Sequence, residues 1–152
     1  MSGWLPVAAG AGSAAAGGVY LAFSVMVMPA LRRKPAADAV TTMTLINEKA
    51  VRAPFMILFF GTAAACAAVV VAAAVDPPAQ PPLRIAGAAA YLAGWISTMT
   101  VNVPLNHRLS VNGAAQPDQV WNSYQRSWTR ANHVRTALSI AGAAGLLAPL
   151  VP

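Results

Sequence analysis

Two groups of polar side chains lie where long apolar stretches of the sequence end or begin. Asn102 and Asn106 close one stretch, and Asn132, His133 and Arg135 open another. Amide and guanidinium groups donate hydrogen bonds, and a histidine exchanges a proton near neutral pH. Because polar groups beside apolar stretches are costly unless they are paired, we expect these side chains to face a bundle interior or a cavity. In a cavity they could hold a polar ligand and move a proton.

A purely structural role explains the same asparagines. Asn102 and Asn106 are four residues apart and share one helix face, and Pro104 between them frees backbone groups that need partners. Asn47 and Asn132 could supply partners from other segments. On these residues alone we favour hydrogen bonds between helices over a ligand site.

Aromatic side chains precede the second polar group. Trp121, Tyr124 and Trp128 recur at helical spacing. Such residues are typical of a membrane interface, where the ring is buried and its N–H or O–H group is wet. The same rings could stack on a flat ligand, and the sequence favours neither interpretation.

The elements that must position these residues are membrane-spanning helices. Hydrophobic residues make up 57% of the 152 residues and charged residues only 9%, against roughly a quarter charged in a soluble domain. Four stretches reach the length of about 20 residues that a bilayer requires. We therefore expect an all-α membrane protein, a four-transmembrane-helix bundle formed by a single domain over residues 1–152. The expected spans cover about 4–28, 55–75, 85–105 and 134–150, with a proline-rich, non-helical turn at 76–82.

The basic residues give the bundle its expected orientation. Of the ten Lys and Arg residues, only Arg84 lies outside the first and third connections and the entry to the fourth span. Basic connections stay in the cytoplasm. We expect a multi-pass protein of the cell membrane with both termini outside and connections one and three cytoplasmic. The net charge of +6 is spread in short clusters between apolar runs, which indicates membrane lipid rather than nucleic acid as the partner.

Both cytoplasmic segments predict amphipathic helices. Ala37, Val40, Met43 and Ile46 recur at helical spacing within residues 35–52. In the other segment Asn112-Gly113 predicts a turn and Pro117 the first turn of a helix. No stop signal follows, so this helix could continue into the fourth span. The many small residues in the spans allow close helix packing, and also association with further copies of the chain.

Several motifs are similar to those of a known family. They are Phe23-Ser24-Val25-Met26-Val27-Met28-Pro29-Ala30-Leu31, Ile46-Asn47 with Pro54-Phe55 and Phe59-Phe60-Gly61, Asn102-Val103-Pro104-Leu105-Asn106, and Trp121-x-x-Tyr124-x-x-x-Trp128-x-x-x-Asn132-His133-x-Arg135-Thr136. With these motifs the sequence resembles the anthrone oxygenase family of small membrane proteins.

The resemblance implies oxidation of an anthrone, a flat lipophilic ketone with an acidic methylene group, to an anthraquinone by molecular oxygen. The deprotonated substrate can pass an electron directly to oxygen, so no cofactor is required. His133 would be the base, and Arg135, Asn102 and Asn106 would stabilise the anion. The residues expected to bind the substrate are Trp121, Tyr124, Trp128, Asn47 and Asn132.

Two alternatives stay open. Copper or iron held by His133 and His107 is less favoured, because a transition-metal site usually needs three good protein ligands and no acidic residue lies within the expected spans. The other alternative is a non-catalytic membrane protein that binds a lipophilic small molecule or serves as an accessory subunit.

Overall fold

The computed structural model describes residues 3–76 and 81–148, and every regular element within them is a helix. Long, unbroken helices follow from the sequence, because its Ala- and Leu-rich stretches contain few residues that interrupt a helix. The elements are α1 (Trp4–Ala22), η1 (Phe23–Val27), α2 (Met28–Leu31), α3 (Ala36–Ala50), α4 (Phe55–Val75), α5 (Pro81–Ser97), η2 (Thr98–Asn102), α6 (Val103–Asn112) and α7 (Pro117–Leu147).

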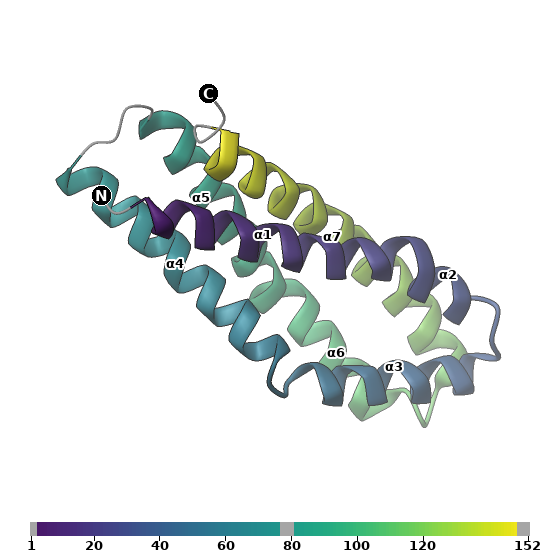
Figure 1. Ribbon diagram of the computed structural model, residues 1–152. Helices are drawn as coiled ribbons and strands as arrows, with labels where there is room; N and C mark the ends of the chain where they lie inside the picture. The colour runs from purple at the N-terminus through teal and green to yellow at the C-terminus, as the bar shows by residue number, and fades with distance from the viewer. Residues whose placement is uncertain (1–2, 77–80, 149–152) are drawn as a thin grey trace.

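Four long helices, α1, α4, α5 and α7, pack side by side (Figure 1). Helices α7 and α4 each contact both α1 and α5, so the four helices form a ring in which α1 and α5 lie diagonally opposite. The start of α1 and the end of α7 lie at one end of the bundle (Figure 1). At the other end α3 packs against α6 and the first half of α7.

Helices α5 and α7 approach so closely that their backbones touch. A Cβ atom added at Gly87 would lie 2.8 Å from the backbone nitrogen of Leu146 and 2.9 Å from the carbonyl oxygen of Gly142. Small residues permit this approach, which maximises van der Waals contact between helices. Glycines on both helices therefore permit the close approach of α5 and α7.

Two of the expected membrane spans correspond to helices that are long and apolar enough, by length and composition, to cross a bilayer. They are the continuous stretch Trp4–Leu31, of 28 residues, and Phe55–Val75, of 21 residues. The first is longer than the expected span because η1 and α2 continue α1 past Met28. The described part of the chain contains no further helix that meets the same criteria.

The remaining helices differ from the expectation mainly in their bounds. Pro81 and Pro82 belong to α5, so the non-helical turn expected at 76–82 is shorter, and its residues 77–80 lie outside the described part. The chain stays helical from α5 through α6 to Asn112. Helix α7 is one helix of 31 residues that begins at Pro117, as the lack of a stop signal suggested. The end of the expected fourth span at residue 150 lies outside the described residues.

The amphipathic helix expected within residues 35–52 is α3. Its buried side chains are Ala39, Val40 and Met43, whereas Ala37, which we expected on the buried face, is exposed. The apolar face packs against α6 and α7, so α3 closes one end of the bundle.

Two helices contain a widened, π-helical turn at equivalent places. In η1 the backbone N–H of Met28 bonds to the carbonyl of Phe23, and in η2 that of Val103 bonds to the carbonyl of Thr98. A proline follows each turn at the same offset, at Pro29 and Pro104. A proline ring inside a helix clashes with the carbonyl four residues earlier and removes one hydrogen bond. We attribute the wide turns to relief of that clash.

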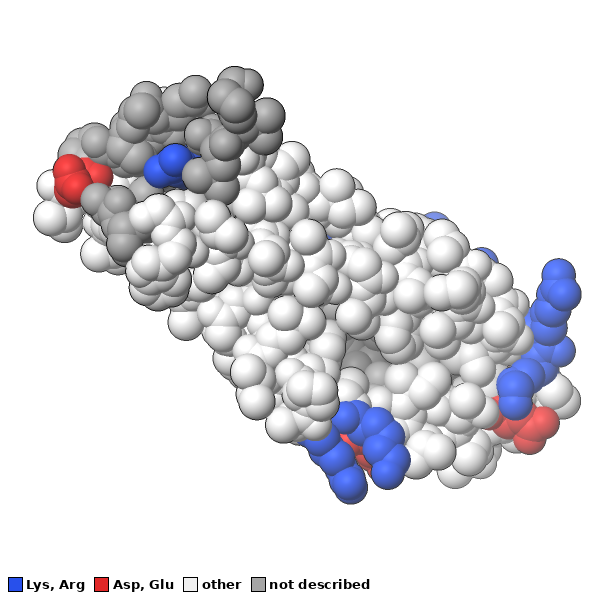
Figure 2. All heavy atoms as spheres, in the orientation of Figure 1, with Lys and Arg blue, Asp and Glu red and all other residues white. Residues whose placement is uncertain are grey.

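Charged side chains gather toward the ends of the molecule. Figure 2 shows Lys and Arg concentrated at the end that carries α3, with a middle free of Lys, Arg, Asp and Glu on the visible face. The basic residues of that end lie at the end of α3, in the connections on either side of it, on α6 and on the first half of α7: Arg32, Arg33, Lys34, Lys49, Arg52, Arg108, Arg126 and Arg130.

Candidate functional site

A pocket of about 510 Å³ lies toward the α3 end of the bundle, between α1, η1, α3, α4, η2, α6 and α7. This volume falls in the range of small-molecule sites. The wall is mostly apolar and rich in aromatic rings, supplied by Tyr20, Phe23, Phe55, Phe59, Phe60 and Trp128.

Several residues of the pocket wall are exposed, so the pocket reaches the surface. Lys49 and Val51, at the end of α3 and just beyond it, line the pocket and are exposed. Phe60 of α4, Met99 of η2 and Val103 of α6 also line it and are 49%, 40% and 45% exposed. The exposed part of the wall therefore combines one basic side chain with apolar ones.

The most polar group in the pocket wall is the guanidinium of Arg135, whose side chain is only 7% exposed. Its Nε donates to Asn132 Oδ1 at 2.9 Å and its Nη1 to Thr98 Oγ1 at 3.4 Å. The guanidinium carbon lies 4.1 Å from the ring centroid of Tyr20 and 5.1 Å from that of Trp128. Two aromatic faces thus stabilise the cation without neutralising it.

No carboxylate balances this charge within the part of the chain described by the structure. The protein has four acidic residues; all of them are exposed and none lines the pocket. An arginine stays protonated at physiological pH. The pocket therefore contains a buried positive charge without a counterion from the described chain.

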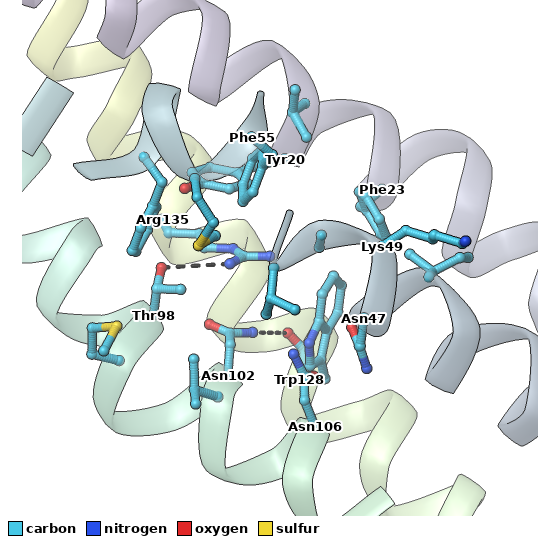
Figure 3. A pocket seen from close by; sticks show the side chains of 18 of the residues that line it. Tyr20, Phe23, Asn47, Lys49, Phe55, Thr98, Asn102, Asn106, Trp128 and Arg135 are labelled. Carbon is cyan, nitrogen blue, oxygen red and sulfur yellow. Dashed lines mark hydrogen bonds between the residues drawn. The ribbon is translucent and has the colours of Figure 1, made fainter. Parts of the chain in front are cut away.

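Three further polar atoms in the pocket wall are buried and lack a hydrogen-bond partner among the described residues. They are the donors Asn47 Nδ2 and Trp128 Nε1 and the acceptor Asn102 Oδ1. Asn102 uses its Nδ2 to donate to the carbonyl oxygen of Trp128 at 3.4 Å. Figure 3 shows Asn47, Asn102, Trp128 and Arg135 around one space. Buried polar groups are nearly always paired, so three unpaired ones along one pocket indicate room for a polar ligand.

Three residues expected to bind substrate, Trp121, Tyr124 and Asn132, do not line the pocket. Trp121 and Tyr124 are buried. The three rings form a stack in which the centroids of Trp121 and Tyr124 are 5.7 Å apart and those of Tyr124 and Trp128 are 6.2 Å apart. Tyr124 Oη donates to Asn106 Oδ1 at 2.9 Å, and burial raises the pKa of this phenol. Trp121 and Tyr124 thus support Trp128 and Asn106, which do line the pocket.

His133 also lies outside the pocket wall. Its side chain is exposed, and its Nδ1 is 3.0 Å from Ser24 Oγ. Ser24 Oγ accepts from Asn132 Nδ2 at 2.7 Å, and the same Nδ2 donates to the carbonyl oxygen of Tyr20 at 2.8 Å. A chain of hydrogen bonds therefore runs from His133 through Ser24 and Asn132 to Arg135. A base at His133 would have to act through this chain.

His107, the other histidine, is exposed on α6. Among the described residues, no three His, Cys, Asp or Glu side chains are grouped so that they could hold a metal ion. Any metal bound by His133 or His107 would therefore need ligands of another kind.

Part of the pocket wall was not expected from the sequence. Tyr20, Thr98 and Lys49 line the pocket, as do the aromatic residues Phe55 and Phe59, and none of them was selected as a site residue. A signal existed for the last two, because aromatic side chains four residues apart share one face of an otherwise Ala-rich helix.

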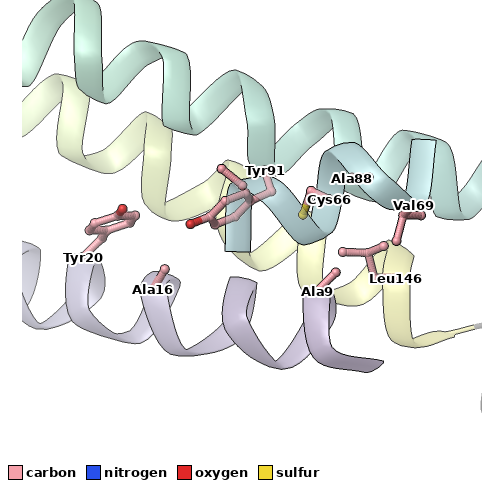
Figure 4. Close-up of a cluster of buried hydrophobic side chains, with 9 residues drawn as sticks. Ala9, Ala16, Tyr20, Cys66, Val69, Ala88, Tyr91 and Leu146 are labelled. Atoms are coloured by element: carbon pink, nitrogen blue, oxygen red, sulfur yellow. The ribbon is translucent and has the colours of Figure 1, made fainter. Parts of the chain in front are cut away.

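Beyond the pocket the bundle is closed by a packed apolar cluster. Tyr20 belongs to both, and the cluster continues through Ala16, Cys66, Tyr91 and Ala9 toward the far end (Figure 4). Alanines and one cysteine leave little space between the helices. Within the described residues, this cluster separates the pocket from the far end of the bundle.

Comparison with known proteins identifies a family. The family model described as anthrone oxygenase matches residues 55–145, more than half of the chain. Among curated proteins and among solved structures, none is significantly similar to the chain. The matched range includes Asn102, Asn106, Trp128 and Arg135, whereas α1 and α3 contribute to the pocket from outside it.

Proposed function

The chain belongs to the anthrone oxygenase family, and from this and the pocket we propose that it is a membrane-embedded oxygenase-like protein. Its substrate is a lipophilic aromatic compound of the anthrone type, which it oxidises with molecular oxygen. The observation that carries the proposal is the guanidinium of Arg135, which lies in the wall of an aromatic pocket and has no carboxylate counterion among the described residues. A flat ketone fits between the rings, and the cation lies where negative charge would develop on it.

We propose that four spans hold this pocket in the membrane, formed by α1, α4, α5 and the second half of α7. The apolar character of α1 and α4 supports this, as does the lack of exposed charged side chains across the middle of the face shown in Figure 2. The basic residues around α3 then face the cytoplasm and both termini face outward. In this orientation the exposed side chains of Phe60, Met99 and Val103 lie toward lipid, and a lipophilic substrate can enter from the bilayer.

The proposed reaction needs an anion stabiliser more than a strong base. Loss of a proton from the methylene carbon of an anthrone gives a delocalised enolate, whose oxygen Arg135 stabilises together with the amides of Asn102 and Asn106. The enolate transfers electrons to oxygen without a cofactor. Overall, the methylene group and one molecule of oxygen give a carbonyl group and one molecule of water. One oxygen atom enters the new ketone, and the other leaves as water with the two methylene hydrogens.

We propose that the proton lost from the methylene carbon leaves through the part of the pocket that opens beside Lys49. No described residue of the pocket wall carries a carboxylate or an imidazole, whereas Lys49 and Val51 connect the wall to the surface. We propose that water at this mouth accepts the proton, because stabilisation of the enolate makes the substrate more acidic. His133 then has an indirect role through Ser24 and Asn132.

The same lack of a base in the wall favours one alternative, a protein that binds a lipophilic compound without changing it. Oxygen uptake and quinone formation by the protein, purified in mild detergent and supplied with a simple anthrone, decide between the two. Boiled protein gives the background of spontaneous oxidation. Oxygen uptake at the background rate would reject the catalytic function and favour the binding function.

Replacement of Arg135 identifies the site. We expect Arg135→Met to lower turnover about a hundredfold. Arg130→Met is the matched control, because Arg130 lies on the same helix but is exposed and remote from the pocket wall. Metal analysis of the active preparation tests the cofactor-free mechanism, which stoichiometric copper or iron would contradict.

A further inference from the structure

We infer that the pocket binds its ligand as an anion, and specifically as a planar aromatic carboxylate or phenolate whose charged oxygen meets Arg135. The inference rests on the proposed function for the location of the site, but it requires no oxidation. It concerns the charge of the ligand when it binds, before any reaction.

The charge of the pocket wall supports an anion. Arg135 is buried in the wall and Lys49 lies at its mouth, and none of the four acidic residues lines the pocket. Glu48 is next to Lys49 in sequence but is exposed outside the pocket. Ionisable side chains in a membrane bundle almost always have a partner, because an unpaired charge is costly there. A ligand anion would supply the partner that the described chain does not.

The unpaired polar atoms fit an oxygen-rich ligand edge. Trp128 Nε1 and Asn47 Nδ2 are donors without partners, and both lie in the same wall as the guanidinium. Carboxylate and phenolate oxygens accept several hydrogen bonds, and those from a cation are the strongest. The one unpaired acceptor, Asn102 Oδ1, fits a hydroxyl group on the same ligand.

The shape of the wall selects a flat ligand over a flexible acyl chain. The aromatic residues Tyr20, Phe23, Phe59 and Trp128 line the space. The Tyr20 and Trp128 rings already cover the guanidinium, so the anion must approach along the remaining edge of the cation. A rigid aromatic acid can do so while its rings stack on the aromatic wall.

The test compares three ligands that lack the acidic methylene group of an anthrone: anthracene-9-carboxylate, its neutral carboxamide and laurate. Calorimetric titration of the detergent-purified protein measures each dissociation constant at neutral pH, with protein-free micelles as the blank. We expect the aromatic carboxylate to bind at least about tenfold more tightly than the carboxamide, the value of one charge-assisted hydrogen bond. It should also bind about tenfold more tightly than laurate.

Variants assign the preference to Arg135. Arg135→Met should reduce the ratio between carboxylate and carboxamide to about twofold or less, whereas Arg135→Lys, which retains the charge, should keep most of it. Arg130→Met should behave like the wild type. The ligand comparison on the unmodified protein stays decisive if Arg135→Met does not fold.

Each outcome has a separate meaning. Equal affinity for the carboxylate and the carboxamide would overturn the anion site, even if the protein oxidises anthrones. Equal affinity for laurate would overturn the assignment of an aromatic ligand. A clear preference for the aromatic carboxylate, together with no oxygen uptake from anthrones, would support this inference and reject the proposed oxidation.

Discussion

Replacing Asn132 by aspartate would place a carboxylate beside Arg135 and so neutralise the charge on which the proposed chemistry depends. Asn132 is fully buried, and its Oδ1 already accepts from Arg135 Nε at 2.9 Å. Asn132→Asp changes one atom of the side chain and keeps this contact. The side chains that form the pocket wall stay the same, because Asn132 does not line it.

The size of the effect follows from the distances. At an effective dielectric constant of about 20, two unit charges about 4 Å apart attract by about 4 kcal/mol, which stabilises the new ion pair. A substrate oxyanion on the other side of the guanidinium, at about 7 Å from the new carboxylate, is repelled by about 2 kcal/mol. This energy corresponds to about a thirtyfold loss in kcat/KM for anthrone oxidation.

Stability should change much less than activity. In the wild-type protein, Asn132 Nδ2 donates to the Tyr20 carbonyl oxygen at 2.8 Å and to Ser24 Oγ at 2.7 Å. An ionised aspartate cannot donate either bond. Each lost bond costs about 1 kcal/mol, and the ion pair with Arg135 offsets this. Asn132→Leu is the control: it loses the same donations, adds no charge and leaves Arg135 Nε unpaired, so it should unfold more easily than Asn132→Asp.

The assay combines oxygen uptake with thermal unfolding of each variant in the same detergent. A stable Asn132→Asp protein with wild-type kcat/KM would refute the reasoning, because a neutralised Arg135 would then be as effective as a free one. Parallel loss of stability and activity in both variants would assign Asn132 to structure alone.

Three further predictions concern packing and the residues around the pocket. In a denaturation assay, Gly87→Ala should lower the free energy of unfolding by about 1–3 kcal/mol, because its Cβ would press on the backbone of α7. Gly61→Ala is the control and should leave the free energy of unfolding nearly unchanged, because no atom lies within 4 Å of the added Cβ. Tyr124→Phe should cost about 1 kcal/mol by leaving Asn106 Oδ1 without its donor. Because burial raises the pKa of Tyr124, wild-type stability should also fall as pH rises above about 10, the value in the unfolded chain, and the phenylalanine variant should lose that part of the pH dependence. His133→Ala should lower turnover less than about fivefold, because the imidazole does not line the pocket. A loss of about a hundredfold, as expected for removal of a general base, would contradict this and support His133 as the base.

The helices were predictable because their signals are local. Proline at 117 marks the start of α7, and the apolar spacing between residues 35 and 52 marks α3. The two π-helical turns were not predictable in this way. A proline inside a helix can cause a kink, a break or a wide turn, and the packing of the neighbouring helices decides among them.

The site was predictable in part. Trp128, Asn132 and Arg135 follow the spacing i, i+4, i+7, which places them on one face of α7. His133 follows Asn132 directly, so its side chain points about 100° away. Helix periodicity alone therefore places His133 on a different face of α7 from the other polar residues, and its role as a base stays a prediction. The contributions of Tyr20 and Thr98 depend on how α1 and η2 meet α7, which no local pattern records.

The two π-helical turns make α1 and α5 unequally sensitive to changes in chain length. Such a turn closes its hydrogen bond over one more residue than an α-helical turn, and so accommodates one extra residue. Deleting a single residue from Phe23–Val27 or Thr98–Asn102 would let the helix return to regular α geometry while the parts on either side keep nearly their present orientation. Deleting a residue from a regular turn of α1 or α5 would instead rotate the parts on either side by about 100° relative to each other. One-residue deletions at the two wide turns should therefore disturb the pocket less than one-residue deletions in the middle of α1 or α5.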